Sequence, residues 1–191
     1  KSIVKQIIKD KKFSIFILES INLFEEPNGY AIGLKSEEIF FIDSTKQNNK
    51  LLKQICEDEN IEVVAYDIKY IAKKLSLYEI KLRGKLFDIS ILHYLLFPES
   101  RRSLALLSSQ YLNVDINLGK EIREEKISDK IIEYCCKAAA ITSKLAIVFE
   151  KKLINKAILS LYNSIEMPLI LVLSKMELNG IKLDKSYLQK L

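Results

Sequence analysis

The residues that could perform acid, base or metal chemistry are few, and their spacing excludes several common sites. The chain has one histidine, His93, and three cysteines, of which Cys135 and Cys136 are adjacent. A zinc site needs spaced Cys and His ligands, and a nucleophile needs a base beside it, so neither site is indicated. The sequence also lacks the glycine-rich loop that cradles nucleotide phosphates. The remaining candidates are carboxylates, which bind hard divalent cations such as Mg²⁺.

Basic residues offer a second kind of chemistry, contact with phosphate groups. The net charge is +5, which permits binding of nucleic acid but does not demand it. Lys81, Arg83 and Lys85 alternate with apolar residues, a pattern that fits a sheet edge with its basic side chains facing outward. We expect this segment to be the candidate DNA contact. The alternative interpretation is an ordinary solvated surface.

The elements that must position these groups indicate a mixed α/β fold. Apolar runs rich in β-formers at 12–18, 30–34 and 39–42 predict a three-stranded antiparallel meander. A helix over 46–57 separates them from a strand at 61–66, which we therefore expect to run parallel to a neighbour. Helical segments are predicted at 67–75, 87–97, 103–112, 128–153, 155–178 and from 184 or 186 onward.

Composition narrows the class of protein. Hydrophobic residues make up 49% and charged residues 29% of 191 residues, which is typical of an ordinary globular chain. No uninterrupted apolar run reaches the roughly 18 residues of a membrane span, so we expect no membrane contact. The free cysteines favour a reducing, cytoplasmic compartment, and we expect a monomer. The chain does not begin with methionine, and we expect it to be a fragment with a boundary between 154 and 155.

Two segments carry a resemblance to a known family. The tail contains E-x-P-L at Glu166–Leu169 and then M-E-x-x-G-I-x-x-D at Met176–Asp184. This pattern resembles the junction in family A DNA polymerases, the bacterial DNA polymerase I type, where the exonuclease domain meets the polymerase domain. Further upstream, Phe87-Asp88-Ile89 and the run from Tyr94 to Pro98 resemble a helix of the same family's 3′–5′ exonuclease domain.

The resemblance implies a fold, a domain division and partners. It implies a ribonuclease-H-like exonuclease fold of the four-carboxylate type, a small mixed sheet surrounded by helices, with a helical C-terminal tail. Residues 1–154 would be the exonuclease-like domain and 155–191 the truncated start of the polymerase domain. The parent enzyme would use Mg²⁺ for template-directed DNA synthesis. This chain would meet DNA through that polymerase and pack against the polymerase domain.

The family's metal ligands can be compared with this sequence position by position. The first motif, F-D-x-E, aligns with Phe16–Glu19, so that Ile17 replaces the aspartate and Glu19 is kept. The second, N-x-K-Y-D, places Ile71 at its aspartate. In the last motif Tyr134 is kept, but Ala138 replaces the aspartate four residues further on. One carboxylate of four remains, and one cannot hold two divalent cations.

The sequence therefore predicts a vestigial exonuclease domain with no catalytic residue, no metal and no cofactor of its own, and with a structural role. The first alternative is an active exonuclease, for proofreading or RNA trimming, that uses a rearranged set of carboxylates. Asp67, Asp88 and Glu133 are the candidates for such a set, against a simpler interpretation of Asp67 as a helix cap. The second alternative is a stand-alone nucleic-acid adaptor built on the same fold.

Overall fold

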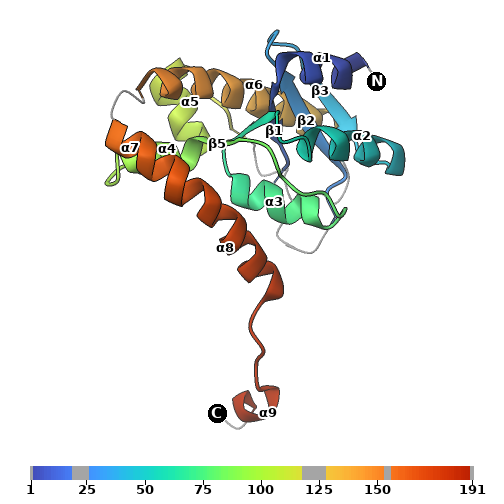
Figure 1. Ribbon diagram of the computed structural model, residues 1–191, viewed down its shortest axis with the longest axis vertical. Coiled ribbons are helices and arrows are strands. Elements are labelled where there is room, and N and C mark those ends of the chain that lie inside the picture. Colours follow the sequence, from blue (N-terminus) through green and yellow to red (C-terminus); the bar gives the residue numbers. More distant parts are fainter. Residues whose placement is uncertain (1, 19–25, 118–127, 153–155, 190–191) are drawn as a thin grey trace.

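A mixed five-stranded sheet forms the centre of the molecule (Figure 1). The computed structural model describes residues 2–18, 26–117, 128–152 and 156–189. The strands are β1 (Lys12–Phe16), β2 (Gly29–Leu34), β3 (Ile39–Asp43), β4 (Glu62–Ala65) and β5 (Leu86–Asp88), in the spatial order β3-β2-β1-β4-β5. β1, β2 and β3 pair antiparallel, while β4 runs parallel to β1 and β5 parallel to β4. The predicted meander and the predicted parallel strand are both confirmed.

Two elements differ from the sequence prediction. The segment 87–97 is not one helix: Leu86–Asp88 pair with β4 as β5, and helix α4 (Ile89–Leu96) starts only after them. Asp88 ends the strand because its side chain accepts the Ile91 N–H and so caps the new helix. In addition, helix α1 (Ser2–Asp10) precedes the first strand, and it buries Ile7 completely. The sequence reasoning did not predict this helix.

Helix α6 (Asp129–Lys152) lies against β1, β2, β3 and β4 (Figure 1). Small residues allow this close approach. The hydroxyl of Ser14 on β1 donates to the Ala139 carbonyl at 3.1 Å and accepts from the Ser143 hydroxyl at 2.7 Å. A Cβ at Gly33 would lie 2.4 Å from the Ser14 oxygen, so β2 needs a glycine there. Helices α1, α2 (Lys46–Cys56), α3 (Ile68–Ser76), α4 and α5 (Leu104–Leu112) complete the body.

The C-terminal part is one long helix with a bulge in it. It comprises α7 (Lys156–Leu161), a π-helical turn η2 (Tyr162–Glu166) and α8 (Met167–Asn179), and it is followed by the short α9 (Lys185–Leu188). Pro168 closely follows the π-helical turn. Because proline has no N–H to donate inside a helix, a local departure from α-helical geometry is expected next to it. Tyr162, Met167 and Ile170 belong to the same core as the sheet. The helix therefore packs on the body, whereas α9 lies well away from it (Figure 1). The boundary between 154 and 155 stays a prediction.

This long helix also bears on the membrane expectation. Residues Ala157–Asn179 form a helix that is long and apolar enough to cross a bilayer, with a mean hydropathy of 1.6. The count of uninterrupted apolar residues overlooked it because Asn163, Ser164 and Glu166 break the run. Length and composition alone are weak evidence of a span, since a helix that packs against a protein partner passes the same test.

Candidate functional site

The three positions at which this sequence departs from the family's carboxylates are buried in one apolar core. Ile17 follows directly after β1 and is 2% exposed, Ile71 lies on α3 and is 3% exposed, and Ala138 on α6 is fully buried. All three belong to the same hydrophobic cluster. The isoleucines therefore fill space in the core and offer no ligand atom.

Hydrogen bonds between uncharged groups, and one contact between aromatic rings, lie around Ile17, Ile71 and Ala138. The Tyr70 hydroxyl of α3 donates to the Leu18 carbonyl at 2.8 Å, which ties α3 to the segment after β1. The ring of Tyr134 packs edge-on against Phe16, with 5.9 Å between centroids. Beside it, the Ala138 carbonyl accepts from the hydroxyl of Thr142. Glu19, the one carboxylate that the alignment keeps, lies outside the described residues.

The carboxylates considered for a rearranged site have other partners. Asp67 is the N-cap of α3 and accepts the Tyr70 N–H at 2.9 Å, as the simpler interpretation predicted. Asp88 is buried and accepts the N–H groups of Ile68 and Ile91, at 2.7 and 3.0 Å, and the Ser90 hydroxyl. Glu133 is an exposed residue of α6. Two of the three candidates thus serve helix N-termini.

Burial dominates the electrostatics of Asp88. Loss of solvent raises the pKa of its carboxyl to about 7, although the hydrogen bonds from Ile91, Ile68 and Ser90 lower it, and the charge of Asp67 adds to the rise. A carboxyl in this state is a poor ligand, because a metal would have to displace its helix N–H donors.

The residues present do not fit a pair of divalent cations. Within the described part of the chain, no three side chains of the His, Cys, Asp or Glu type come together as a possible metal site. A two-metal site requires several oxygen ligands that converge on one point. The aligned positions supply apolar side chains there instead.

Sequence reasoning missed a polar junction between the body and the long helix. The Tyr162 hydroxyl of η2 accepts the Asp88 N–H at 2.6 Å and donates to the Asp88 carbonyl at 3.1 Å. Further along, Glu177 of α8 binds the ammonium groups of Lys69 and Lys73 on α3, at 2.7 and 2.5 Å. The hydrogen bonds from Lys69 and Lys73 lower the pKa of Glu177. The i, i+4 spacing of the two lysines was the available signal, since it places both on one face of a helix.

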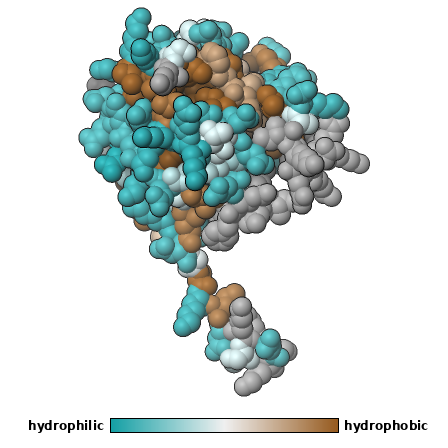
Figure 2. Space-filling model, turned by 90° about the vertical axis from the view of Figure 1, so that its right-hand side faces the viewer, coloured by the Kyte–Doolittle hydropathy of each residue, from teal (hydrophilic) through white to brown (hydrophobic). Residues whose placement is uncertain are grey.

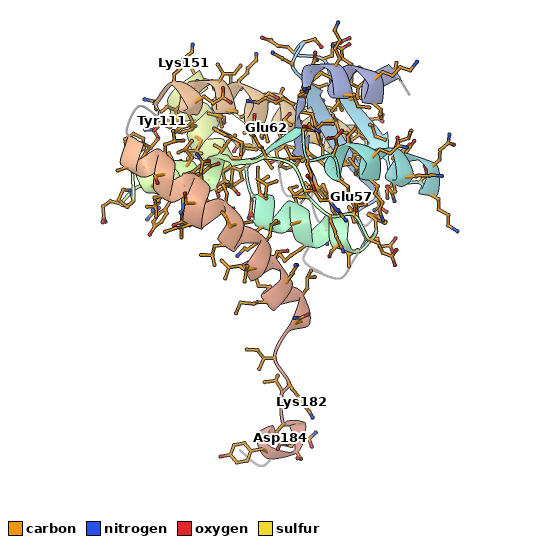
Figure 3. The ribbon with its side chains drawn as sticks, in the orientation of Figure 1. Glu57, Glu62, Tyr111, Lys151, Lys182 and Asp184 are labelled. Atoms are coloured by element: carbon orange, nitrogen blue, oxygen red, sulfur yellow. The ribbon has the colours of Figure 1, made fainter. Side chains whose placement is uncertain are left out.

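The basic segment has the predicted alternation. Lys81, Arg83 and Lys85 are exposed, and Ile80 and Leu82 are buried beside them. The segment leads into β5, which is an edge strand of the sheet. An acidic group lies close by, because Glu57, labelled in Figure 3, accepts the Lys81 backbone N–H. Contact between this segment and DNA stays a prediction.

His93 and a small cavity offer no catalytic arrangement. His93 is buried among the rings of Phe97, Tyr111 and Phe149, and neither ring nitrogen has a hydrogen-bond partner in the part of the chain that the structure describes. Burial, with a smaller effect of Arg102, lowers its pKa. His93 is therefore a packed core residue. A cavity of about 190 Å³ lies between α6 and strands β1 and β2, and its lining includes Gly33 and Ile147 but neither Ile17 nor Ile71.

The architecture defines the class of protein. A sheet of three antiparallel and two parallel strands with α6 on one face is the ribonuclease-H-like fold of 3′–5′ exonucleases. The sequence model of the DNA polymerase I ribonuclease H-like domain matches residues 13–123, more than half of the chain. The chain therefore belongs to that family, and the resemblance seen in its motifs is confirmed.

Curated relatives and solved structures agree with this assignment. The chain is 29% identical over 181 residues to DNA polymerase I of Borreliella burgdorferi and 26% identical over 188 residues to that of Bacillus subtilis. These matches cover 87% and 93% of this chain but only 19% and 21% of the relatives, so the chain spans about a fifth of their length.

Among solved structures, the polymerase domain of Pol1 from M. smegmatis, in complex with a DNA primer-template and dNTP, superposes with a TM-score of 0.82 at 19% identity. The superposition covers 98% of this chain and 32% of that one. NrnC of Brucella melitensis, bound to pGG, gives a TM-score of 0.78 at 16% identity, over 91% of this chain and 88% of that one. At such identities these structures support the fold alone.

Proposed function

We propose that this chain is the exonuclease-like domain of a DNA polymerase I, that it does not hydrolyse DNA, and that it supports the polymerase domain structurally. The observation that carries the proposal is the burial of Ile17, Ile71 and Ala138 in one core. Two divalent cations bring four positive charges, and Glu19 alone brings one negative charge. Without further carboxylates, the free energy that the cations lose on dehydration would exceed the free energy gained from binding to the site.

The active alternative requires Asp67, Asp88 or Glu133 to take the place of the missing ligands. Asp67 and Asp88 each cap a helix, and Glu133 is exposed on α6. Recruiting the first two would leave helix N–H groups without acceptors, which costs about 1–3 kcal/mol for each buried group. The geometry therefore favours the inactive form.

The names of the relatives, DNA polymerase I, support DNA synthesis by a longer protein. The metal, the compartment and the monomeric state are proposed from the resemblance alone. The longer protein would carry out template-directed DNA synthesis with Mg²⁺, in replication and repair, as a cytoplasmic bacterial monomer. DNA would be bound mainly by the polymerase portion, and Lys81, Arg83 and Lys85 would add contacts to the phosphate backbone. Alanine at these three positions should then reduce the salt dependence of duplex binding by the longer protein, by a slope of at most about 2.7.

The test of inactivity uses single-stranded DNA labelled at its 5′ end, with Mg²⁺ or Mn²⁺ and the unmodified chain. We expect no shortening of the strand from its 3′ end. Glu19→Ala is the matched variant for the retained ligand, and Asp67→Asn is the matched variant for a rearranged site. Shortening by the unmodified chain that either substitution abolishes would establish the active alternative.

A further inference from the structure

The cavity between α6 and the sheet lies outside the region of the family's metal ligands, and its walls are mainly apolar. Ile39 of β3 and Val64 of β4 line it on the side of the sheet, and Ala140 and Ile147 line it on the side of α6. Ile147 is 50% exposed, so the cavity reaches the surface beside it. Figure 2 shows hydrophobic (brown) residues at the surface of the upper part of the body, the level at which Figure 1 places α6, β2 and β3. A small molecule could therefore enter the cavity from solvent.

The size and shape of the cavity indicate the size and shape of an occupant. Its volume of about 190 Å³ exceeds the roughly 150 Å³ of an engineered apolar cavity that binds benzene. A helix packed on a sheet leaves a slot between two facing walls, and a flat ring fits a slot better than a branched aliphatic group does. One aromatic ring with one or two small substituents thus fits, and burial of the ring would supply most of the binding energy.

Two serine hydroxyls in the wall can accept a hydrogen bond from an occupant but cannot donate one. Ser14, which is 2% exposed, donates its hydroxyl proton to the Ala139 carbonyl at 3.1 Å. Ser143 donates its own proton to the Ser14 oxygen at 2.7 Å. Both protons are used, whereas each oxygen keeps a lone pair without a donor in the described part of the chain. An O–H or N–H group of an occupant would therefore be favoured beside the serine pair, and an anion would not.

The lining beside β4 carries an excess of negative charge. Lys12 of β1 binds two carboxylates, Glu62 of β4 at 2.8 Å and Glu150 of α6. Glu62 stands directly beside Lys12 in the parallel register of β1 and β4. One ammonium group is thus shared by two carboxylates, so an anionic group of an occupant would be repelled from this side of the cavity.

The lining at the turn between β2 and β3 is where positive charge remains available. Lys35 is exposed, and within the described residues it has no ion-pair partner. Lys144 of α6 has only a loose contact of 4.0 Å with Glu37, whose side chain is 75% exposed. Both lysines line the cavity. A carboxylate of an occupant would therefore lie at this turn, beside two ammonium groups.

We propose that the cavity binds a small molecule with one aromatic ring that carries a hydrogen-bond donor at one end and a carboxylate at the other. The ring lies between Ile39 and Ile147, and the donor faces the serine pair. The carboxylate lies beside Lys35. The proposal requires neither nuclease activity nor a polymerase portion, so it stands independently of the proposed function.

Methyl NMR of the 191-residue chain tests the proposal with 4-hydroxybenzoate as the probe. We expect saturable shifts of the methyl signals of Ile39 and Ile147, with a dissociation constant of about 1 mM or below. Ile8 on α1, which is also 50% exposed, is the control and should not shift. Benzoate lacks the donor and should bind about fivefold more weakly. Phenol lacks the carboxylate and should bind about threefold more weakly.

Substitutions assign the two ends of the probe. Lys35→Gln should weaken 4-hydroxybenzoate about threefold and leave phenol unchanged, whereas Ser143→Ala should weaken 4-hydroxybenzoate about fivefold and leave benzoate unchanged. Lys50→Gln on α2, another exposed lysine, is the matched control and should leave all three affinities unchanged. Ile147→Trp enlarges an exposed side chain at the opening and should abolish binding without disturbing the core.

Three results would overturn the proposal. If Ile39 and Ile147 showed no saturable shift with 4-hydroxybenzoate up to about ten times the expected 1 mM constant, the cavity would not admit the ring. Equal affinity for the three probes would identify an unselective apolar void. Unchanged binding in Ile147→Trp would place the probe elsewhere on the chain. None of these measurements uses DNA or a metal ion, so each is distinguishable from failure of the inactive-domain proposal.

Discussion

The two faces of helix α3 have opposite chemistry. On one face Ile71, at the position of a metal-binding aspartate in the family pattern, is buried in the core with Ile17. On the other face Lys69 and Lys73 keep their charges and bind Glu177 of α8. Residue 71 lies midway between the two lysines, about 200° round the helix from each. α3 thus contacts α8 through its charged face and the core through its apolar face, the face on which the family pattern has a metal-binding aspartate.

The N-terminus of α3 also contributes to holding the long helix. Asp88 accepts the Ile68 N–H there, and the Tyr162 hydroxyl is bonded to the backbone of Asp88. The long helix is therefore attached to α3 at two points, one buried and one near the surface. Substitutions on the apolar face and at the two attachment points should separate their contributions.

The largest effect is expected from restoring the carboxylates. Ile17→Asp, Ile71→Asp and Ala138→Asp together would place three acidic groups in the buried core, alongside Glu19. An unpaired buried charge costs several kcal/mol, and neighbouring carboxyls resist ionisation together. We expect a much lower melting temperature that Mg²⁺ partly recovers, with exonuclease activity absent or far below that of a proofreading enzyme. Calorimetry and the labelled-strand assay measure the two outcomes.

Ile8→Asp on α1, at a residue 50% exposed, is the control for adding a carboxylate without burying it. It should change the melting temperature little. Robust digestion of single-stranded DNA by the triple variant would contradict the contrast between the two faces of α3. It would mean that the apolar face still has the shape of an active cleft.

The buried attachment point should give the domain an unusual pH dependence. Burial raises the pKa of Asp88 to about 7, above the value near 3.9 in an unfolded chain. The folded state therefore holds a proton that the unfolded state releases between about pH 4 and 7, and stability falls as pH rises through that window. The slope from this group is at most about 1.4 kcal/mol per pH unit. Urea denaturation from pH 5 to 8 should show the fall, and Asp88→Asn should remove it. An identical slope in the variant would contradict the assignment.

Tyr162→Phe removes the hydroxyl at the same attachment point and keeps the ring that packs against Phe87. The backbone N–H and carbonyl of Asp88 would lose a partner in a buried place, at a cost of about 1–3 kcal/mol. Hydrogen exchange should increase most in η2 and in the N-terminal turns of α8. Tyr187→Phe on α9, where the residue is 63% exposed, is the matched control and should have no effect. A uniform change over the whole body would mean that Tyr162 does not attach the helix specifically.

Local sequence pattern was sufficient for most of the fold. The meander, the parallel strand and the Asp67 cap are encoded by neighbouring residues: β-branched runs, a crossover helix and a side chain ahead of the helix. β5 was missed because three residues are too few to show a period, and only pairing with β4 makes them a strand. No element was predicted before residue 12, although Ile3, Ile7 and their neighbours have the spacing of one helix face.

The candidate site divides in the same way. The aligned motifs located Ile17, Ile71 and Ala138. The structure confirms that Ile71 and Ala138 lie on helices, α3 and α6. The pairing of Lys69 and Lys73 with Glu177 joins residues more than 100 positions apart, and no local pattern specifies it. The same holds for Asp88 and Tyr162, whose contact depends on the extra residue in the π-turn.

The smallest effect is expected at the attachment point nearer the surface. Glu177→Gln removes the charge that binds Lys69 and Lys73 but keeps the size of the side chain. Because the Glu177 side chain is 39% exposed, solvent screens the pair, and the loss in stability should be about 0.2–1 kcal/mol. The hydrogen bonds from Lys69 and Lys73 lower the pKa of Glu177, so its contribution is present above the unfolded pKa and is lost as pH falls through the lower folded value. High salt should reduce the difference in stability between the unmodified chain and Glu177→Gln.

Glu37→Gln, which removes the looser 4.0 Å pair with Lys144, is the control and should have a smaller effect still. If Glu177→Gln left both stability and hydrogen exchange at the end of α8 unchanged, the charged face of α3 would not hold that helix, and the contrast between the two faces would rest on the Asp88 and Tyr162 contact alone.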